Sequence, residues 1–276
     1  MSRRERSSGE AMKITHAIKT TAVMGCALLA GVLTGGQVAV AQPRQPPAPP
    51  PGPPPPAQQV APIDLTGYWV AIVSEDWRWR MLTPPHGDYA SVPLNPEGRK
   101  VADLWTTAQD GSCRAYGAAG LMRMPTRLHI TWADPNAIKI ESDWGEQTRM
   151  LYFRRADISA SAPSLQGSSF AAWERPVPVQ TGLGLGAPGK PPPGGHLKVV
   201  TDDLAPGWLR RNGVPYGSRT QLTEYFETFP DPTGKKWFDV TTVVDDPEYL
   251  SAPFLTSSDF RQEPDGSNWA PHPCKG

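Results

Sequence analysis

From residue 63 onward, apolar and polar side chains alternate with a period of two in one run after another. This alternation is typical of β-strands that bury one face and expose the other. It predicts strands over residues 67–73, 77–81, 127–132, 137–142, 147–153, 169–174, 197–201, 220–229, 237–245 and 259–263. The chain is therefore expected to fold as a mainly β protein.

Turn residues between these runs predict hairpins. Residues 133–136 read Ala-Asp-Pro-Asn and residues 231–234 read Asp-Pro-Thr-Gly, which are favourable turn sequences. One short helix interrupts the pattern: Asn95 is suited to its N-cap, Pro96 to its first turn, and Val101, Leu104 and Trp105 to its apolar side.

We expect an antiparallel meander β-barrel with one short helix, because closure removes the exposed edges of a sheet. A sandwich of two sheets is the alternative. Residues 63–276, about 210 residues, are expected to form this barrel as a single domain. Residues 177–195 are rich in Gly and Pro and are predicted to be a long surface loop.

The first 41 residues have the pattern of an export signal. Lys13 and Lys19 precede an apolar run over residues 21–33, and Ala39-Val40-Ala41 is a small-x-small cleavage site. The run is shorter than the roughly 20 residues that span a bilayer, so we expect cleavage after Ala41 and no membrane span afterwards. This predicts a periplasmic or secreted protein. Met12 is an alternative start, and lipidation at Cys26 is disfavoured because the apolar run continues past it.

Residues 42–62 are predicted to be a proline-rich, disordered linker. Proline fixes φ and lacks an amide donor, so this segment should be an extended spacer without regular structure. It is expected to hold the domain away from the cell envelope, and it is also a candidate contact for an envelope partner.

The charge balance argues against nucleic acid as a partner. The 27 basic and 27 acidic residues of the whole chain cancel. Five basic and two acidic residues lie in the signal, leaving 22 and 25, a net charge of −3. Such a surface has no electrostatic attraction for nucleic acid or anionic lipid.

Two cysteines, Cys113 and Cys274, are left after loss of the signal. In an oxidising compartment an even pair favours a disulfide, here one that joins the body of the domain to the C-terminus. A metal site is the poorer alternative, since two isolated cysteines lack the ligand spacing of zinc sites.

Two sequence patterns resemble known groups of proteins. Gly67-Tyr68-Trp69 resembles the Gly-x-Trp opening of lipocalin-type barrels, in which the Trp plugs the closed end. The runs at 223–226 (Thr-Glu-Tyr-Phe), 243–247 (Val-Val-Asp-Asp-Pro) and 253–254 (Pro-Phe) are similar to a pattern in secreted, β-rich bacterial proteins of unassigned function. The resemblance implies export and a lipocalin-like barrel, and it carries over no active-site residue.

Ten tryptophans form the largest compositional excess. Aromatic side chains suit both a packed core and a ligand cavity. Trp77, Trp79 and Trp132, together with Trp144, are the candidates for lining a cavity, and core packing is the alternative. This reading predicts that a small apolar or amphipathic molecule binds inside an aromatic-lined barrel.

Glu224 shares a strand face with Leu222 and Phe226, so a carboxylate lies on an apolar face. Burying it requires a partner or protonation. Arg149 is the expected counter-ion. The pair is either structural or, with neighbouring Tyr225, the polar part of the ligand site.

The alternative function is that of a cofactor-independent lyase, isomerase or hydrolase. His129 and Glu141 fall on adjacent predicted strands, so an acid/base couple of His129 with Glu141 or with Glu224 is the catalytic candidate. The remaining histidines lack the spacing of a metal site, and no Walker loop or Gly-x-Ser-x-Gly occurs. We therefore expect neither a metal nor another cofactor.

Overall fold

The computed structural model describes residues 52–109, 112–160, 162–176 and 194–274. The predicted signal peptide, residues 42–51 of the predicted linker and most of the Gly/Pro-rich loop lie outside these residues. Residues 52–276 form one compact unit.

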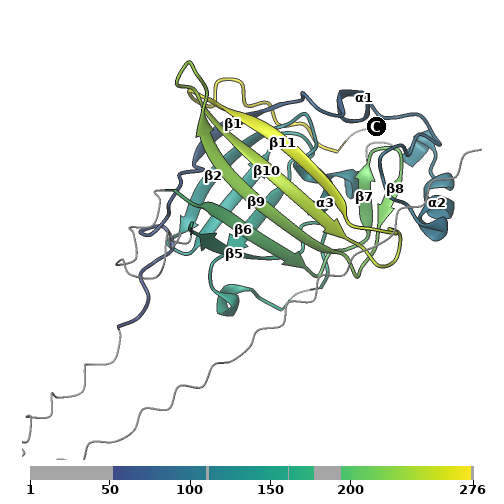
Figure 1. Ribbon diagram of the computed structural model, residues 1–276. Coiled ribbons are helices and arrows are strands. Elements are labelled where there is room, and N and C mark those ends of the chain that lie inside the picture. The colour runs from purple at the N-terminus through teal and green to yellow at the C-terminus, as the bar shows by residue number, and fades with distance from the viewer. Residues whose placement is uncertain (1–51, 110–111, 161, 177–193, 275–276) are drawn as a thin grey trace, which may run out of the picture. The chain divides into compact units, whose positions relative to one another are not determined.

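Nine strands close into a barrel in the order β1-β11-β10-β9-β6-β5-β4-β3-β2 (Figure 1). Their bounds are β1 Gly67–Ile72, β2 Arg127–Asp134, β3 Ala137–Ser142, β4 Thr148–Tyr152, β5 Ser168–Glu174, β6 His196–Asp202, β9 Gln221–Pro230, β10 Lys236–Asp245 and β11 Phe254–Glu263. The sequence therefore predicted the barrel correctly, and the two-sheet alternative is excluded.

One pairing departs from the antiparallel meander. β4 and β5 run parallel, with only Leu151↔Ser169 and Tyr152↔Phe170 in register, whereas the other eight neighbouring pairs are antiparallel. The connection between these strands, which contains the 3-10 helix η3 (Arg155–Asp157), is long enough to bring the chain back before β5 begins.

A second layer, which we call the cap, lies at one end of the barrel (Figure 1). It consists of α2 (Pro96–Asp103), α3 (Ala118–Leu121), the 3-10 helix η2 (Cys113–Tyr116) and a hairpin of β7 (Gly207–Arg210) and β8 (Val214–Tyr216). Its apolar residues pack on Leu222, Val244 and Phe254 of the barrel strands. The cap therefore seals this end.

The predicted helix is α2. The Asn95 side chain accepts a hydrogen bond from the Gly98 amide at 2.8 Å, as expected of an N-cap. Trp105 after it is buried, but Leu104 is 77% exposed, so only part of the predicted apolar side packs. The 3-10 helix η1 (Thr107–Gln109) follows.

The predicted strand over residues 77–81 is wrong, because Trp77–Arg80 forms a short helix, α1. Asp76 takes a left-handed conformation with φ 51°, and its carbonyl accepts from the Trp79 amide at 2.8 Å. The buried residue of α1 is Arg80, whose Nε donates to the Arg123 carbonyl at 2.9 Å. Polar contacts with distant residues thus override the local alternation, and Trp77 is left 64% exposed.

The barrel interior is packed with side chains. Trp69 is fully buried, its Nε1 donates to the Leu65 carbonyl at 2.8 Å, and its ring meets Phe238 edge-on at 4.8 Å. Aliphatic and aromatic side chains of the same cluster fill the remaining lumen: Leu128, Ile130, Ile138, Ile140, Leu151, Ala171, Leu197, Val199, Phe226, Val240 and Phe260. The Trp of the Gly-x-Trp opening is thus a core residue.

A short strap crosses the barrel end opposite the cap. The Ala57 amide donates to Asn136 Oδ1 at 3.0 Å, and the Gln58 amide donates to the Pro135 carbonyl at 3.0 Å. Trp173 Nε1 donates to the Ala57 carbonyl at 2.9 Å. Residues 57–58, inside the segment expected to be a linker, are therefore docked on the β2–β3 turn.

The predicted disulfide is present between Cys113 and Cys274, with Cα atoms 5.2 Å apart and a sequence separation of 161 residues. It fastens the C-terminal segment to η2 in the cap.

We predict that the double variant Cys113→Ser with Cys274→Ser lowers the free energy of unfolding by about 3–5 kcal/mol, because a long loop is released in the unfolded chain. Urea unfolding of both proteins measures this difference. A loss below about 1 kcal/mol would show that the bridge contributes little to stability.

Candidate functional site

The predicted pair of Arg149 and Glu224 is confirmed in the barrel interior. Arg149 Nη1 donates to Glu224 Oε1 at 3.0 Å, and Nη2 donates to Oε2. Both side chains have no exposed surface. The bidentate geometry is the one that best compensates a buried carboxylate.

Two hydroxyl groups complete this network. Arg149 Nε donates to Ser169 Oγ at 3.2 Å, Nη2 donates to Thr201 Oγ1 at 2.8 Å, and the two hydroxyls lie 2.8 Å apart. The guanidinium and the carboxylate are thus satisfied within the protein. This geometry is that of a structural pair, with no face open to a ligand.

Trp132 lies at the strap end of the barrel in an aromatic cluster. Its ring stacks on Phe153 at 5.6 Å, and Trp173 lies 5.2 Å from Phe153. All three are partly buried and pack against the main core. Since Trp173 also holds the strap, this cluster closes the end of the barrel.

The other predicted ligand residues lie outside the lumen. Trp77 and Trp79 belong to α1, where the Trp79 ring lies under the guanidinium groups of Arg78 and Arg210. Tyr225 alternates with buried Glu224 and Phe226, and its ring contacts His196 on the outer wall.

His129 and Glu141 are brought together as predicted, but on the outer face of the barrel. They are register partners on β2 and β3, with His129 Nδ1 3.3 Å from Glu141 Oε2. The Tyr68 ring stacks on the imidazole at 4.2 Å. Glu224 lies inside the barrel, so the wall separates it from His129. The couple of His129 with Glu141 thus lies outside the lumen, and His129 and Glu224 are not brought together.

A pocket of about 320 Å³ lies beside the disulfide. Its walls combine two aromatic rings, two basic side chains and two small or rigid residues: Tyr116, Trp144, Arg211, His272, Gly145 and Pro273. We call it the cap pocket. Trp144 is the one tryptophan, among those proposed from the sequence to line a cavity, that lines this pocket.

Four segments build the cap pocket, and Arg211 comes from the turn between β7 and β8. Tyr116 comes from η2, Trp144 and Gly145 follow β3, and His272 comes from the C-terminal segment. The Gly145 amide donates to the His272 carbonyl at 2.8 Å, and the His272 amide donates to the Asp143 carbonyl at 2.7 Å. Cys274 then ties the segment to Cys113, so the disulfide holds one wall of the pocket in place.

The other described pockets have different linings. The largest, about 570 Å³, is a groove between residues 234–236 and 261–264 without an aromatic wall. A groove of about 270 Å³ includes Arg155, Phe170 and Asp202, and another of about 220 Å³ lies around Trp105 and Trp208. Aromatic and basic side chains also meet in these two smaller grooves. Of the four pockets, the cap pocket is the one that combines such walls with a volume in the range typical of small-molecule sites, roughly 300–1,000 Å³.

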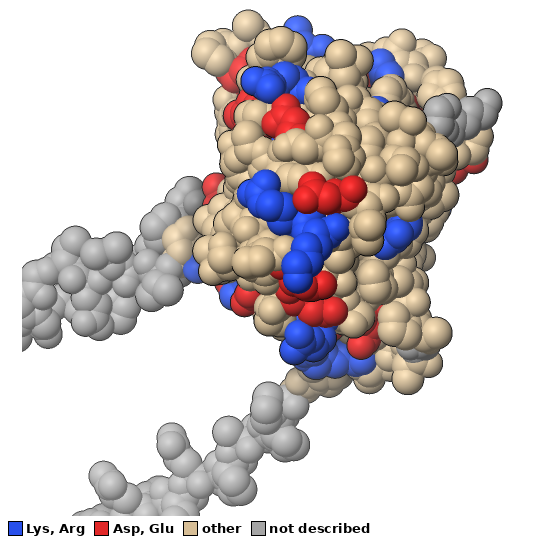
Figure 2. Space-filling view, turned by 90° about the vertical axis from the view of Figure 1, so that its right-hand side faces the viewer, with Lys and Arg blue, Asp and Glu red and all other residues tan. Residues whose placement is uncertain are grey.

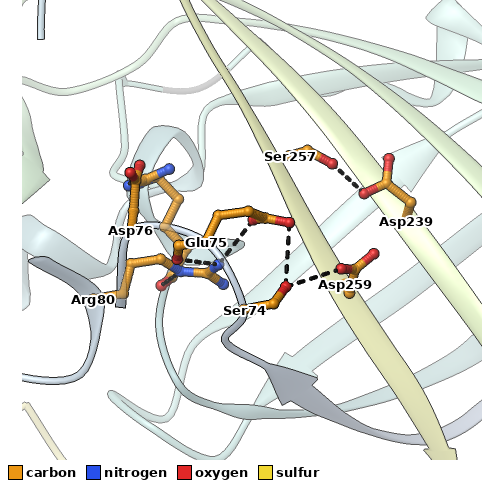
Figure 3. A network of polar contacts seen from close by, with 8 residues as sticks. Ser74, Glu75, Asp76, Arg80, Asp239, Ser257 and Asp259 are labelled. Carbon is orange, nitrogen blue, oxygen red and sulfur yellow. Dashed lines mark hydrogen bonds and ion pairs between the residues drawn. The ribbon is translucent and has the colours of Figure 1, made fainter. Parts of the chain in front are cut away.

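A polar network joins α1 to the outer face of β10 and β11 (Figure 3). Asp239 and Asp259 are register partners, and Ser257 donates to Asp239. Ser74 Oγ donates to Asp259 at 3.4 Å and lies 3.3 Å from Glu75, which pairs with Arg80 at 3.5 Å. Burial, and then the charge of Asp239, raise the pKa of Asp259; burial, and then Asp259, raise the pKa of Glu75.

The sequence interpretation missed the cap pocket and this network. The residues of the cap pocket come from loops, turns and a short helix, which carry no periodic signal. The network joins α1 and the segment before it to residues of β10 and β11 that are distant in sequence. Two arginines of the network region, Arg80 and Arg123, are buried, and neither was assigned a role from the sequence. The dense run Trp-Arg-Trp-Arg at 77–80 is the one signal that pointed to this region.

Acidic and basic side chains lie next to one another along a band of the face shown in Figure 2, so this face has no patch of one sign. Across the described residues, no group of three or more His, Cys, Asp or Glu is arranged to hold a metal ion. Within that same part of the chain, no helix is long and apolar enough to cross a membrane.

The fold and the cap pocket define a closed, disulfide-linked β-barrel with a lateral cavity. Comparisons with known protein families, with curated proteins and with solved structures found no match to this chain.

We predict that Arg149→Met lowers the free energy of unfolding by about 3–5 kcal/mol, because Glu224 is left buried without a partner. The double variant Arg149→Met with Glu224→Leu should recover most of this loss, since no charge is then buried. Urea unfolding of the three proteins tests this. Equal losses in the single and double variants would contradict it.

We predict that Asp259→Asn raises the free energy of unfolding at pH 7. A raised pKa means that the folded state binds the proton more tightly than the unfolded state, so ionisation of Asp259 destabilises the fold as pH rises. The gain should vanish below the unfolded pKa of about 3.9.

Asp265→Asn is the matched control for this titration, because hydrogen bonds from Ser267 lower the pKa of Asp265. Asp265→Asn should lower the free energy of unfolding at pH 7, and this loss should disappear in acid. Urea titrations at pH 3 and pH 7 measure both variants. A gain in Asp259→Asn that is the same at both values would refute the prediction.

Proposed function

We propose that this protein is exported and binds a small, amphipathic, anionic molecule in the cap pocket. The observation that carries the proposal is the combination of the Tyr116 and Trp144 rings with Arg211 and His272 around one cavity of about 320 Å³. Aromatic walls bury the apolar part of a ligand, and the basic groups favour a carboxylate, sulfonate or phosphate on it.

Arg211 is held in place for this role. One of its terminal nitrogens donates to the Arg80 carbonyl at 3.1 Å, and the residue is partly buried. A guanidinium has five N–H donors, so a single backbone contact orients it and leaves donors for an anion. Its restricted motion lowers the entropy cost of binding.

The ligand site is therefore moved from the lumen, where the sequence placed it, to the side of the barrel. Arg149 and Glu224 satisfy each other without exposed surface, and the lumen holds a continuous apolar cluster. A ligand there would displace packed side chains, whereas the cap pocket is already open.

The disulfide supports the exported location. Such bridges form and persist in oxidising compartments and are rare in the cytosol. The Cys113–Cys274 bridge also fixes the C-terminal wall of the cap pocket, so binding should require the oxidised protein.

We predict that the oxidised domain, residues 42–276, binds 1-anilinonaphthalene-8-sulfonate, an aromatic sulfonate, at one site. Trp144→Leu and Arg211→Met should each weaken binding about tenfold or more, because they remove an aromatic wall and a charged donor. Probe fluorescence gives the dissociation constants.

Trp77→Leu is the matched control, since Trp77 is exposed on α1 outside the pocket. It should bind the probe as the parent protein does. Native mass spectrometry of protein purified from a periplasm then shows whether a ligand accompanies it. Unchanged probe binding in both Trp144→Leu and Arg211→Met would overturn the proposal.

A further inference from the structure

Three arginines are buried together where the β7–β8 hairpin meets α1. Arg80, Arg123 and Arg210 are 3%, 5% and 2% exposed, respectively. Arg80 Nε donates to the Arg123 carbonyl at 2.9 Å, and the charge of Arg123 acts on both of the other guanidinium groups. We call these three residues the arginine cluster. None of the three lines the cap pocket, although Arg211 of that pocket follows Arg210 and donates to the Arg80 carbonyl.

The carboxylates around the cluster do not neutralise all of it. Asp76 pairs with Arg123 at 2.8 Å, Glu75 approaches Arg80 at 3.5 Å, and Asp88 pairs with Arg78 at 2.9 Å. All three nitrogens of the Arg210 guanidinium are buried without a hydrogen-bond partner among the described residues. Arg80 Nη2 is likewise buried without a hydrogen-bond partner among the described residues.

Such orphaned charges are costly, because a buried charged donor that makes no hydrogen bond has lost its hydration without compensation. Burial, and then the like charge of Arg123, lower the pKa of Arg80 and the pKa of Arg210 to about 10. Both groups are still cationic at neutral pH. A buried polar group without a partner calls for a bound species that the protein chain does not itself provide.

The position of Trp79 leaves the donors of Arg210 available. The guanidinium carbon lies 4.7 Å from the centre of the Trp79 ring, so the indole covers one face of the group. The N–H bonds of a guanidinium lie in its plane and point outward from its edges. The stack therefore fixes Arg210 while its edges stay free for an acceptor.

We propose that the arginine cluster binds a small oxyanion, which accepts hydrogen bonds from the free edges of Arg210 and from Arg80 Nη2. The unpaired atoms of these two residues are donors, which excludes a cation and favours a ligand with several acceptor oxygens. A phosphate or a phosphate group matches this requirement. The anion would tie β7 of the cap to α1.

The test uses the oxidised domain, residues 42–276, and compares unfolding in sodium phosphate and in sodium chloride of equal ionic strength. At phosphate about 100 times its dissociation constant, the melting temperature of the parent protein should rise by roughly 5–10 °C. Phosphate also stabilises proteins non-specifically, so the measured quantity is the difference between parent and variant.

Arg210→Met is the decisive variant. The matched control is Arg154→Met, which changes an exposed arginine in the connection between β4 and β5. In chloride, Arg210→Met should be at least as stable as the parent, because it removes a buried charge without a partner. In phosphate the parent should become the more stable of the two. Arg154→Met should follow the parent in both salts.

Direct binding keeps the proposal testable if Arg210→Met fails to fold. Isothermal titration of the parent and of Arg210→Lys with inorganic phosphate and with phenyl phosphate should show one site, weakened tenfold or more by the lysine. If only inorganic phosphate gives binding heat, the site holds a free ion. If phenyl phosphate binds as well, the site accepts the phosphate group of a larger molecule. No heat with either, and the same phosphate effect in parent and Arg210→Met, would overturn the proposal.

Discussion

The barrel depends on a buried ion pair that crosses its weakest junction. β4 and β5 share only two register pairs and run parallel, so few backbone hydrogen bonds hold them together. Arg149 on β4 reaches across this junction to Ser169 on β5, Thr201 on β6 and Glu224 on β9. One side chain thereby links four strands through bonds whose geometry is specific. A buried pair often adds little to stability compared with apolar packing, but it selects one register, because a slip of one residue would leave both charges unpaired.

Because packed side chains fill the closed barrel, the surfaces open to a ligand lie at its ends and sides. The strap and the Trp132 cluster cover one end, and the cap covers the other. Both proposed ligand sites belong to the cap or its border, where short helices and loops bring together residues distant in sequence. Rigid barrels commonly support function in this manner, since loops tolerate polar groups that a packed lumen excludes.

Buried polar groups are fully paired in the barrel interior and only partly paired where the cap meets α1. The Arg149 network is complete, whereas Arg210 and part of Arg80 lack partners. The two sites also differ in how they are held: the C-terminal wall of the cap pocket depends on the Cys113–Cys274 bridge, and the arginine cluster on packing between α1 and β7. Oxidation would thus govern the cap pocket, and an oxyanion would govern the contact of α1 with the hairpin.

The alternation of side chains, the turn residues and the cysteine count were enough to predict nine barrel strands, two hairpin turns, the disulfide and the Arg149–Glu224 pair. These features follow from local geometry or from the high cost of a buried charge, which limits the choice of partner. Two outcomes were decided only by tertiary structure: the helix at Trp77–Arg80 and the parallel pairing of β4 with β5. Each depends on contacts between residues far apart in the chain. The cap pocket is the extreme case, because four segments far apart in the sequence meet there without any local sequence signal.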